Sequence, residues 1–145
     1  MKQFLNSLPK LFVLAFFTAG IAIIFYDQPC TSSSGTARTG FVLPEFSELA
    51  KTGERLFGAN CFVCHGKLAK GTDSGPPLVH DIYNPGHHPD ESFYLAVRQG
   101  VGQHHWPFGN MPARPQLKRP DVTAIIQYVR ELQVANGIVY RPHVM

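Results

Sequence analysis

Two cysteines and a histidine form the most specific chemical pattern in the sequence: Cys61, Cys64 and His65, in the order C-x-x-C-H. Two residues between the cysteines let both sulfur atoms reach one edge of a planar macrocycle, and the adjacent imidazole is then directed at a metal in its centre. The pattern is typical of covalent haem c attachment, in which the thiols add to the vinyl groups and the histidine binds iron. The sequence therefore predicts one covalently bound haem c.

A redox-active thiol pair and a structural zinc site are the alternatives for these cysteines. A redox pair would need a βαβ pattern around it, and a zinc site would need a second pair of ligands at a regular spacing. The only other cysteine, Cys30, stands alone, and the residues that flank the motif have a helical pattern. Both alternatives are therefore less favoured than haem.

The composition indicates one modest all-α domain with an appendage. The chain has 145 residues, 44% of them hydrophobic, and its 12 prolines and 13 glycines indicate turn-rich connections between short helices, with little sign of a β-sheet. The formal net charge is +3, and no basic run with interleaved aromatic residues occurs. Nucleic acid is therefore not an expected partner.

The N-terminal residues 1–26 predict a single transmembrane helix. Residues 8–26 are almost entirely apolar and follow Lys2, with Lys10 near the start of the run. A helix of this length spans roughly 28 Å at ~1.5 Å per residue, close to the ~30 Å hydrocarbon layer of a bilayer. The lysines place the N-terminus in the cytoplasm and all residues after Tyr26 on the other side.

A cleaved signal peptide is the alternative for residues 1–26. Gly20 and Ala22 are small enough for a cleavage site, but the mature chain would then begin with the apolar residues 23–26. We favour the retained anchor, with a soluble periplasmic form as the alternative. In both cases the haem domain is exported, and we expect it in the periplasm at a bacterial inner membrane.

The remaining chain divides into a linker, a haem domain and a tail. Residues 27–43 are rich in Ser, Thr and Gly and predict a flexible linker, in which Cys30 is an incidental unpaired thiol. Residues 44–135 are the predicted haem domain, and residues 136–145 form a tail to which the sequence gives no role. Within the domain, helical patterns cover residues 44–57, 90–100 and 119–132. The expected inward-facing residues are Leu49, Gly53, Leu56, Phe57, Phe93, Ala96, Val97, Val122, Ile125, Ile126, Val129 and Leu132.

Gly53, Phe57 and Tyr128 suggest how the first and last helices pack. A glycine inside a helix costs about 1 kcal/mol relative to alanine, so Gly53 is best explained by the close approach of another helix. Here the sequence resembles the class I cytochromes c, whose first and last helices cross through a glycine and aromatic residues. The resemblance covers residues 46–133 and implies the class I cytochrome c fold, with three to five short helices around one haem.

The resemblance also implies two further haem contacts. In the family, the carbonyl of the first proline in a G-P-x-L stretch accepts a hydrogen bond from the haem histidine, and Pro76 matches that position. A methionine followed by proline, before the last helix, is the distal iron ligand in the family. Met111 matches it, and Met1 and Met145 are terminal. The expected iron ligands are therefore His65 and Met111.

Five histidines compete with Met111 as the sixth ligand: His80, His87, His88, His104 and His105. For His87 and His88 we expect solvated loop positions. Trp106 and Phe108 are expected to form a wall of the haem crevice, where the Trp106 N–H can meet a propionate or a carbonyl. The adjacent histidine pairs also permit a second metal, most readily copper, although neighbouring residues converge on one ion only through a turn.

The leading functional hypothesis is a membrane-tethered monohaem electron carrier rather than an enzyme. His/Met ligation leaves no open iron site, so no small-molecule substrate is expected, and the partners are redox proteins such as an oxidase, reductase or dehydrogenase. The alternatives are a haem subunit of a larger membrane complex, and a haem enzyme or gas sensor in which Met111 is not bound.

Overall fold

The computed structural model describes residues 40–142 of the chain. The chain divides into two units, Met1–Ala37 and Arg38–Met145, and all of the described residues belong to the second. The predicted membrane helix, Cys30 and most of the predicted linker lie outside the described residues. Among residues 40–142, no helix combines the length and the apolar character that a membrane crossing requires.

The described part of the chain is helical, as the sequence predicts. In chain order the elements are α2 (Glu48–Asn60), α3 (Phe62–His65), η1 (Lys67–Ala69), η2 (Asp81–Tyr83), α4 (Asp90–Gln99) and α5 (Arg119–Ala135), where η denotes a 3-10 helix. The β-type pairings within residues 40–142 are isolated bridges, Thr72 with Gly75 and Val101 with Met111. The segment after His65 contains η1, in which Ala69 is buried.

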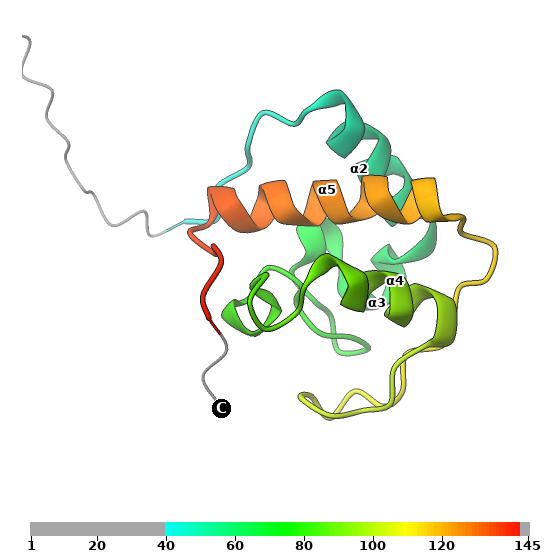
Figure 1. Cartoon of the computed structure of the whole chain (residues 1–145). Coiled ribbons are helices and arrows are strands. Elements are labelled where there is room, and N and C mark those ends of the chain that lie inside the picture. Colours follow the sequence, from blue (N-terminus) through cyan, green and yellow to red (C-terminus); the bar gives the residue numbers. More distant parts are fainter. Residues whose placement is uncertain (1–39, 143–145) are drawn as a thin grey trace, which may run out of the picture. The chain divides into compact units, whose positions relative to one another are not determined.

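Helices α2 and α5 cross in direct backbone contact, as Gly53 predicts. A Cβ atom on Gly53 would overlap the carbonyl group of Ala124 and lie 2.9 Å from the Cβ of Tyr128. On one side of the crossing the Phe57 and Tyr128 rings pack with their centroids 5.4 Å apart. Figure 1 shows α5 running across the domain between α2 and α4.

The first helix begins at Glu48, later in the chain than the sequence pattern indicates. Ser47 caps it: the Ser47 Oγ accepts a hydrogen bond from the Ala50 N–H at 3.2 Å and donates one to Glu131 of α5 at 2.6 Å. The buried residues of α2 are Ala50, Gly53 and Phe57. The prediction that Leu49 faces inward is wrong: its side chain is 45% exposed, because Ala50 is the residue on the face toward α5.

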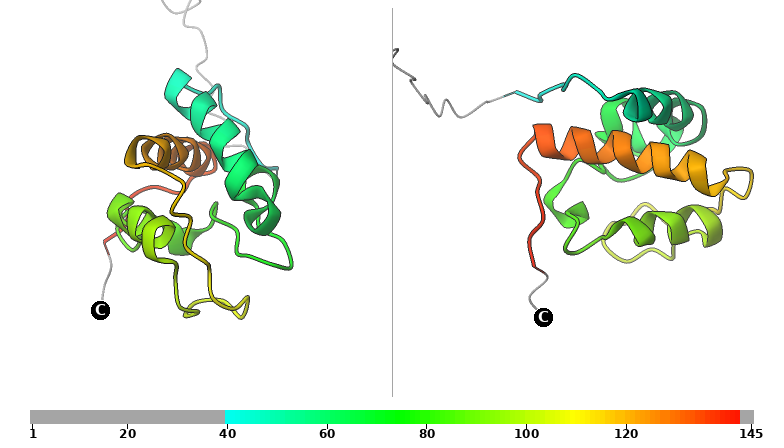
Figure 2. Two further views of the ribbon diagram at one scale, coloured as in Figure 1. Left: turned by 90° about the vertical axis from the view of Figure 1, so that its right-hand side faces the viewer. Right: turned by 45° about the horizontal axis from the view of Figure 1, so that its top comes forward.

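The predicted apolar stripe of the last helix is buried as expected. Val122, Ile125, Ile126, Val129 and Leu132 are each at most 4% exposed. The N-terminal end of α5 packs on α4 through Val97, which forms a cluster with Val122 and Ile126. The two views in Figure 2 show that α5 separates α2 from α4. This one helix therefore fixes where the other two lie.

Residues 136–142, to which the sequence gives no role, are part of the domain. Ile138 is 7% exposed. The Asn136 side chain accepts a hydrogen bond from the Val42 N–H and donates one to the Val42 carbonyl, both at 2.8 Å. Further along, the Arg141 N–H donates to Asn84 Oδ1 at 3.3 Å. The segment thus joins both the start of the domain and the turn that follows η2.

We expect Gly53→Val to destabilise the domain strongly. The added atoms meet the Ala124 backbone, which cannot move aside without separating the two helices, so the free energy of unfolding should fall by at least about 2 kcal/mol. Gly58 provides a matched control in the same helix, because a Cβ there would meet nothing within 4 Å. Gly58→Ala should raise stability by about 0.5 to 1 kcal/mol. Denaturant unfolding measures both, and equal effects would contradict the proposed crossing constraint.

Candidate functional site

The C-x-x-C-H motif forms a single helical turn directly after α2. The N–H of Cys61 donates to the Phe57 carbonyl at 2.8 Å, and the N–H of His65 donates to the Cys61 carbonyl at 2.9 Å. Residues at i, i+3 and i+4 share one face of a helix, so Cys61, Cys64 and His65 lie together. Val63, which lies between them in the sequence, is on the opposite face of the turn and is 81% exposed. The side chains of Cys61, Cys64 and His65 therefore lie on the same side of the turn.

His65 is held in one tautomer. Its Nδ1 lies 2.9 Å from the carbonyl oxygen of Pro76, and because a carbonyl only accepts, Nδ1 carries the hydrogen. The second ring nitrogen, Nε2, is left with its lone pair. Burial lowers the pKa of His65 and outweighs the opposing effect of the Pro76 hydrogen bond. The imidazole is therefore neutral near pH 7 and suited to bind a metal.

The segment that carries Pro76 is packed tightly against the motif. Gly75 is buried, and a Cβ on it would lie 2.8 Å from the Cys64 carbonyl oxygen. The Thr72 hydroxyl donates to that same carbonyl at 2.7 Å. Because Gly75 has no side chain, the chain can approach Cys64 closely, and this brings the Pro76 carbonyl within hydrogen-bond distance of His65. The structure therefore supports, in geometry, the role that the family resemblance implies for Pro76.

A cavity of about 350 Å³ opens beside the motif. Its size is in the usual range for a cofactor site, and most of its wall is apolar. Residues of α2, α4, α5 and the segments between them line the cavity. They include Phe57, Cys61, His65, Phe93, Ala96, Val97, Trp106, Phe108, Met111 and Ile125. The structure therefore gathers the predicted thiol, imidazole and thioether groups around one space, except that Cys64 lines a smaller adjoining pocket.

Met111 closes the loop that follows α4. Its backbone pairs with Val101, with N–H to carbonyl distances of 2.9 and 3.0 Å in the two directions. This bridge brings residues 101 and 111 side by side and leaves the loop between them folded over the cavity. Met111 lines both the main cavity and the adjoining pocket, as does His65. The two predicted iron ligands, from distant parts of the sequence, thus share one site.

Trp106 lies in the wall of the cavity, as predicted. Its indole Nε1 is buried and makes no hydrogen bond within residues 40–142. The nearby Tyr83 hydroxyl has a raised pKa, because burial outweighs its contact with Trp106. A buried N–H without an acceptor is costly, so this donor is suited to a polar group of a bound molecule.

The histidines divide between the cavity and its surroundings. His88, His104 and His105 line the cavity, whereas the exposed His80 accepts the Ile82 N–H at 3.2 Å and stands edge-on to the Trp106 ring. The prediction that His87 and His88 are solvated is wrong, since both are half-buried. Burial lowers the pKa of His88. His87 and His88 are half-buried because the turn after η2 folds them back toward the loop that contains His104 and His105.

A buried polar network that the sequence analysis missed supports this turn. The guanidinium of Arg130 donates to the Tyr83 carbonyl at 2.8 Å, to the His88 carbonyl at 2.6 Å and to Gln133 at 2.7 Å. Gln133 is fully buried and donates to the Leu78 and Tyr83 carbonyls. The i, i+3 spacing of Arg130 and Gln133 indicates that they are neighbours on α5 beside the apolar stripe. The spacing does not indicate which groups they bind.

The donor set fits a covalently attached haem. Cys61, a neutral imidazole and a thioether line an apolar cavity, Cys64 lines the adjoining pocket, and the buried indole of Trp106 lies in the cavity wall. The pKa of the Cys61 thiol is raised to about 11 by burial. The free Cys61 thiol is therefore protonated near pH 7, which makes it a weak nucleophile.

We expect Arg130→Met to destabilise the domain. Methionine keeps much of the apolar stem but leaves the His88 carbonyl without its donor and the Tyr83 carbonyl with only its longer bond from Gln133, so the free energy of unfolding should fall by about 2 kcal/mol. Arg119→Met is the control, because its ion pair with Glu91 is long, at 3.5 Å, and exposed. That change should cost less than about 1 kcal/mol. Thermal unfolding of both variants checks the difference, and similar losses would count against the network.

Comparison with known proteins identifies the family of the chain. The family model described as Cytochrome c matches residues 50–133, which include the C-x-x-C-H motif and Met111. No curated protein matches the sequence. Among solved structures, the chain is similar to the c-type cytochrome XoxG from Methylobacterium extorquens AM1, with 24% sequence identity and a TM-score of 0.48. That similarity covers 67% of this chain and 58% of the XoxG chain, so this chain spans less than two thirds of XoxG.

Proposed function

Because the chain belongs to the cytochrome c family, which implies a covalent haem c and haem-based electron transfer, we propose that it is a monohaem electron carrier with His65 and Met111 as iron ligands. The observation that carries this proposal is the shared cavity. His65, with Nε2 free of the Pro76 hydrogen bond, and Met111, at the base of a closed loop, line the same space. Haem bound there would supply one-electron chemistry at its iron.

The protein residues around the cavity favour a high reduction potential. Phe57, Val97 and Ile125 form apolar walls, and excluding water disfavours the more highly charged oxidised state. The neutral imidazole of His65, fixed by Pro76, holds its ligand nitrogen in one orientation. A thioether partner raises the potential further relative to a second imidazole. The site thus suits a carrier that accepts electrons readily.

The partners we propose are redox proteins such as an oxidase, a reductase or a dehydrogenase. Transient docking of this kind uses small and wet interfaces. The exposed Phe62 and Val63, on the outer side of the motif turn, provide apolar surface next to Cys61 and Cys64. This surface supports the proposal of electron exchange close to the thioether edge of the haem.

We also propose that residues 1–26 tether the domain to the bacterial inner membrane and that the domain works in the periplasm. The support is the apolar run at residues 8–26, of bilayer length, with lysines on its N-terminal side. Export also agrees with covalent haem attachment by Cys61 and Cys64, since those bonds form after translocation.

Met111→Ala tests the iron ligation. The oxidised wild-type protein should show the weak far-red band of sulfur bound to iron, and its reduced form should not bind carbon monoxide. The variant should lose the band, bind carbon monoxide and have a lower reduction potential, because the strong thioether ligand is gone. Met145→Leu, which removes the terminal methionine, is the control and should behave as wild type.

Two other results would contradict the proposal in different ways. Carbon monoxide binding by the reduced wild-type protein would indicate an open iron site, and an enzyme or gas sensor would replace the carrier. A wild-type protein with neither the band nor carbon monoxide binding would indicate histidine as the sixth ligand, with His104 or His105 as the candidates. Co-purification of the full chain with other redox subunits would favour a component of a larger complex.

Membrane fractionation tests the tether. The full chain should sediment with membranes after a high-salt wash, because burial of an apolar helix does not depend on salt, whereas electrostatic docking does. Replacing residues 1–26 with a cleavable signal peptide should release a soluble haem protein into the periplasm. A full chain that appears in the soluble fraction with a shortened N-terminus would establish cleavage instead.

A further inference from the structure

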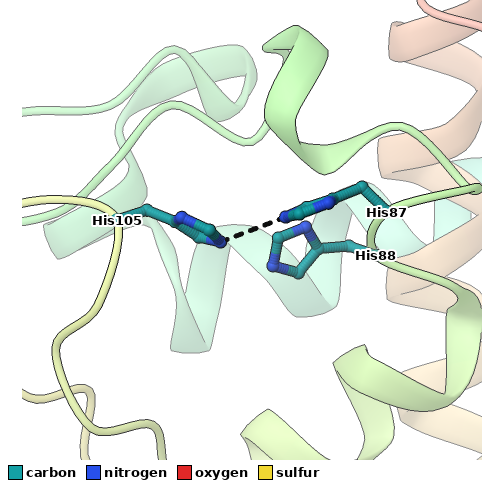
Figure 3. Close-up of side chains that lie close together, drawn as sticks. All are labelled: His87, His88 and His105. Atoms are coloured by element: carbon teal, nitrogen blue, oxygen red, sulfur yellow. Dashed lines mark hydrogen bonds between the residues drawn. The ribbon is translucent and has the colours of Figure 1, made fainter. Parts of the chain in front are cut away.

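Two pairs of adjacent histidines meet at the edge of the haem cavity. His87 and His88 end the turn that follows η2, and His104 and His105 lie in the loop between α4 and α5. The ring centroids of His87 and His105 are 5.2 Å apart, and those of His88 and His105 are also 5.2 Å apart. Figure 3 shows His105 approaching the other two from the opposite side of the gap.

Three of these imidazoles are arranged so that one ion can reach them all. One ligand nitrogen each from His87, His88 and His105 lies within 4.8 Å of the others. The Nε2 atoms of His87 and His105 face each other at 3.3 Å. Two nitrogens bound to one tetrahedral zinc ion, at about 2.0 to 2.1 Å each, are separated by about 3.3 Å. This pair therefore already has the separation that a shared metal requires.

The backbone fixes the orientation of His88. Its Nδ1 lies 2.6 Å from the Ile82 carbonyl oxygen, so Nδ1 carries the hydrogen and Nε2 keeps its lone pair. The His88 carbonyl in turn accepts from Arg130 at 2.6 Å. Metal-binding histidines commonly donate their other ring N–H to a backbone carbonyl in this way. Adjacent histidines can bind one ion only if the backbone turns between them and their partner. Here the N–H groups of His87 and His88 both donate to the Asn84 carbonyl and hold this turn in place.

The donor atoms of the cluster suit a transition-metal cation. Several protonated imidazoles in this space would repel one another, whereas neutral ones can share a single cation. Imidazole nitrogen is a preferred ligand of zinc and copper, and not of calcium or magnesium.

We propose that His87, His88 and His105 form a second metal site, which binds one divalent transition-metal ion such as Zn²⁺ or Cu²⁺ in addition to the haem iron. The three ligands are half-buried or exposed, so the ion can enter from solvent. The site connects the turn after η2 with the loop that leads to Met111. Binding therefore ties two segments of the cavity wall together, and the bound ion stabilises the folded domain.

Metal titration of the tag-free holoprotein, treated with a chelator beforehand, tests the site. Calorimetry with Zn²⁺ should give one equivalent per haem iron, and thermal unfolding should shift to a higher temperature. Electron paramagnetic resonance with Cu²⁺ added to the oxidised protein should show hyperfine coupling to imidazole nitrogens. The haem spectrum should keep its far-red band, since the ion does not displace the iron ligands. The two titrations also distinguish which metal binds more tightly.

Variants of single histidines locate the site. His87→Gln and His105→Gln should each weaken binding at least tenfold, and His105 is exposed, so its replacement does not disturb the core. His80→Asn is the matched control: it also removes an imidazole, but asparagine still offers an acceptor for the Ile82 N–H, and binding should be unchanged. Either no stoichiometric binding, or binding that both glutamine variants retain, would overturn the proposal.

Discussion

The backbone contact between α2 and α5 at Gly53 and Ala124 is the constraint on which the rest of the domain depends. It sets the position of the C-terminal end of α2, and the C-x-x-C-H turn follows that end with no intervening residue. It also leaves the opposite face of α5 to α4, through Val97 and Val122. The cavity is the space that remains between these three helices and the loops. A small change in the crossing would therefore displace every cofactor contact at once.

Much of this architecture could be predicted from the sequence because its signals are local or periodic. The i, i+3, i+4 spacing from Val122 to Leu132 identifies a buried helical face, and Gly53 inside a helix indicates a close neighbour. The inward direction of Leu49 was predicted wrongly because the start of α2 depends on Ser47, whose side chain is bound by Glu131, 84 residues away. No local pattern contains that contact.

The polar parts of the site were harder to predict for the same reason. Arg130 and Gln133 act by satisfying the carbonyls of Leu78, Tyr83 and His88, and nothing in the sequence of α5 specifies those acceptors. The folded turn at His87 and His88 depends on this network, so their burial could not be expected from a Pro- and Gly-rich segment. The motif residues around Cys61, in contrast, need only one helical turn to come together.

The pairing of Asn136 with Val42 has a mechanical consequence. One side-chain amide holds both the N–H and the carbonyl of Val42, so the start of the domain is clamped to the end of α5 by two parallel hydrogen bonds. Val42 precedes α2 in the chain, so tension applied through the preceding residues would load these two hydrogen bonds before it reached α2 and the motif turn.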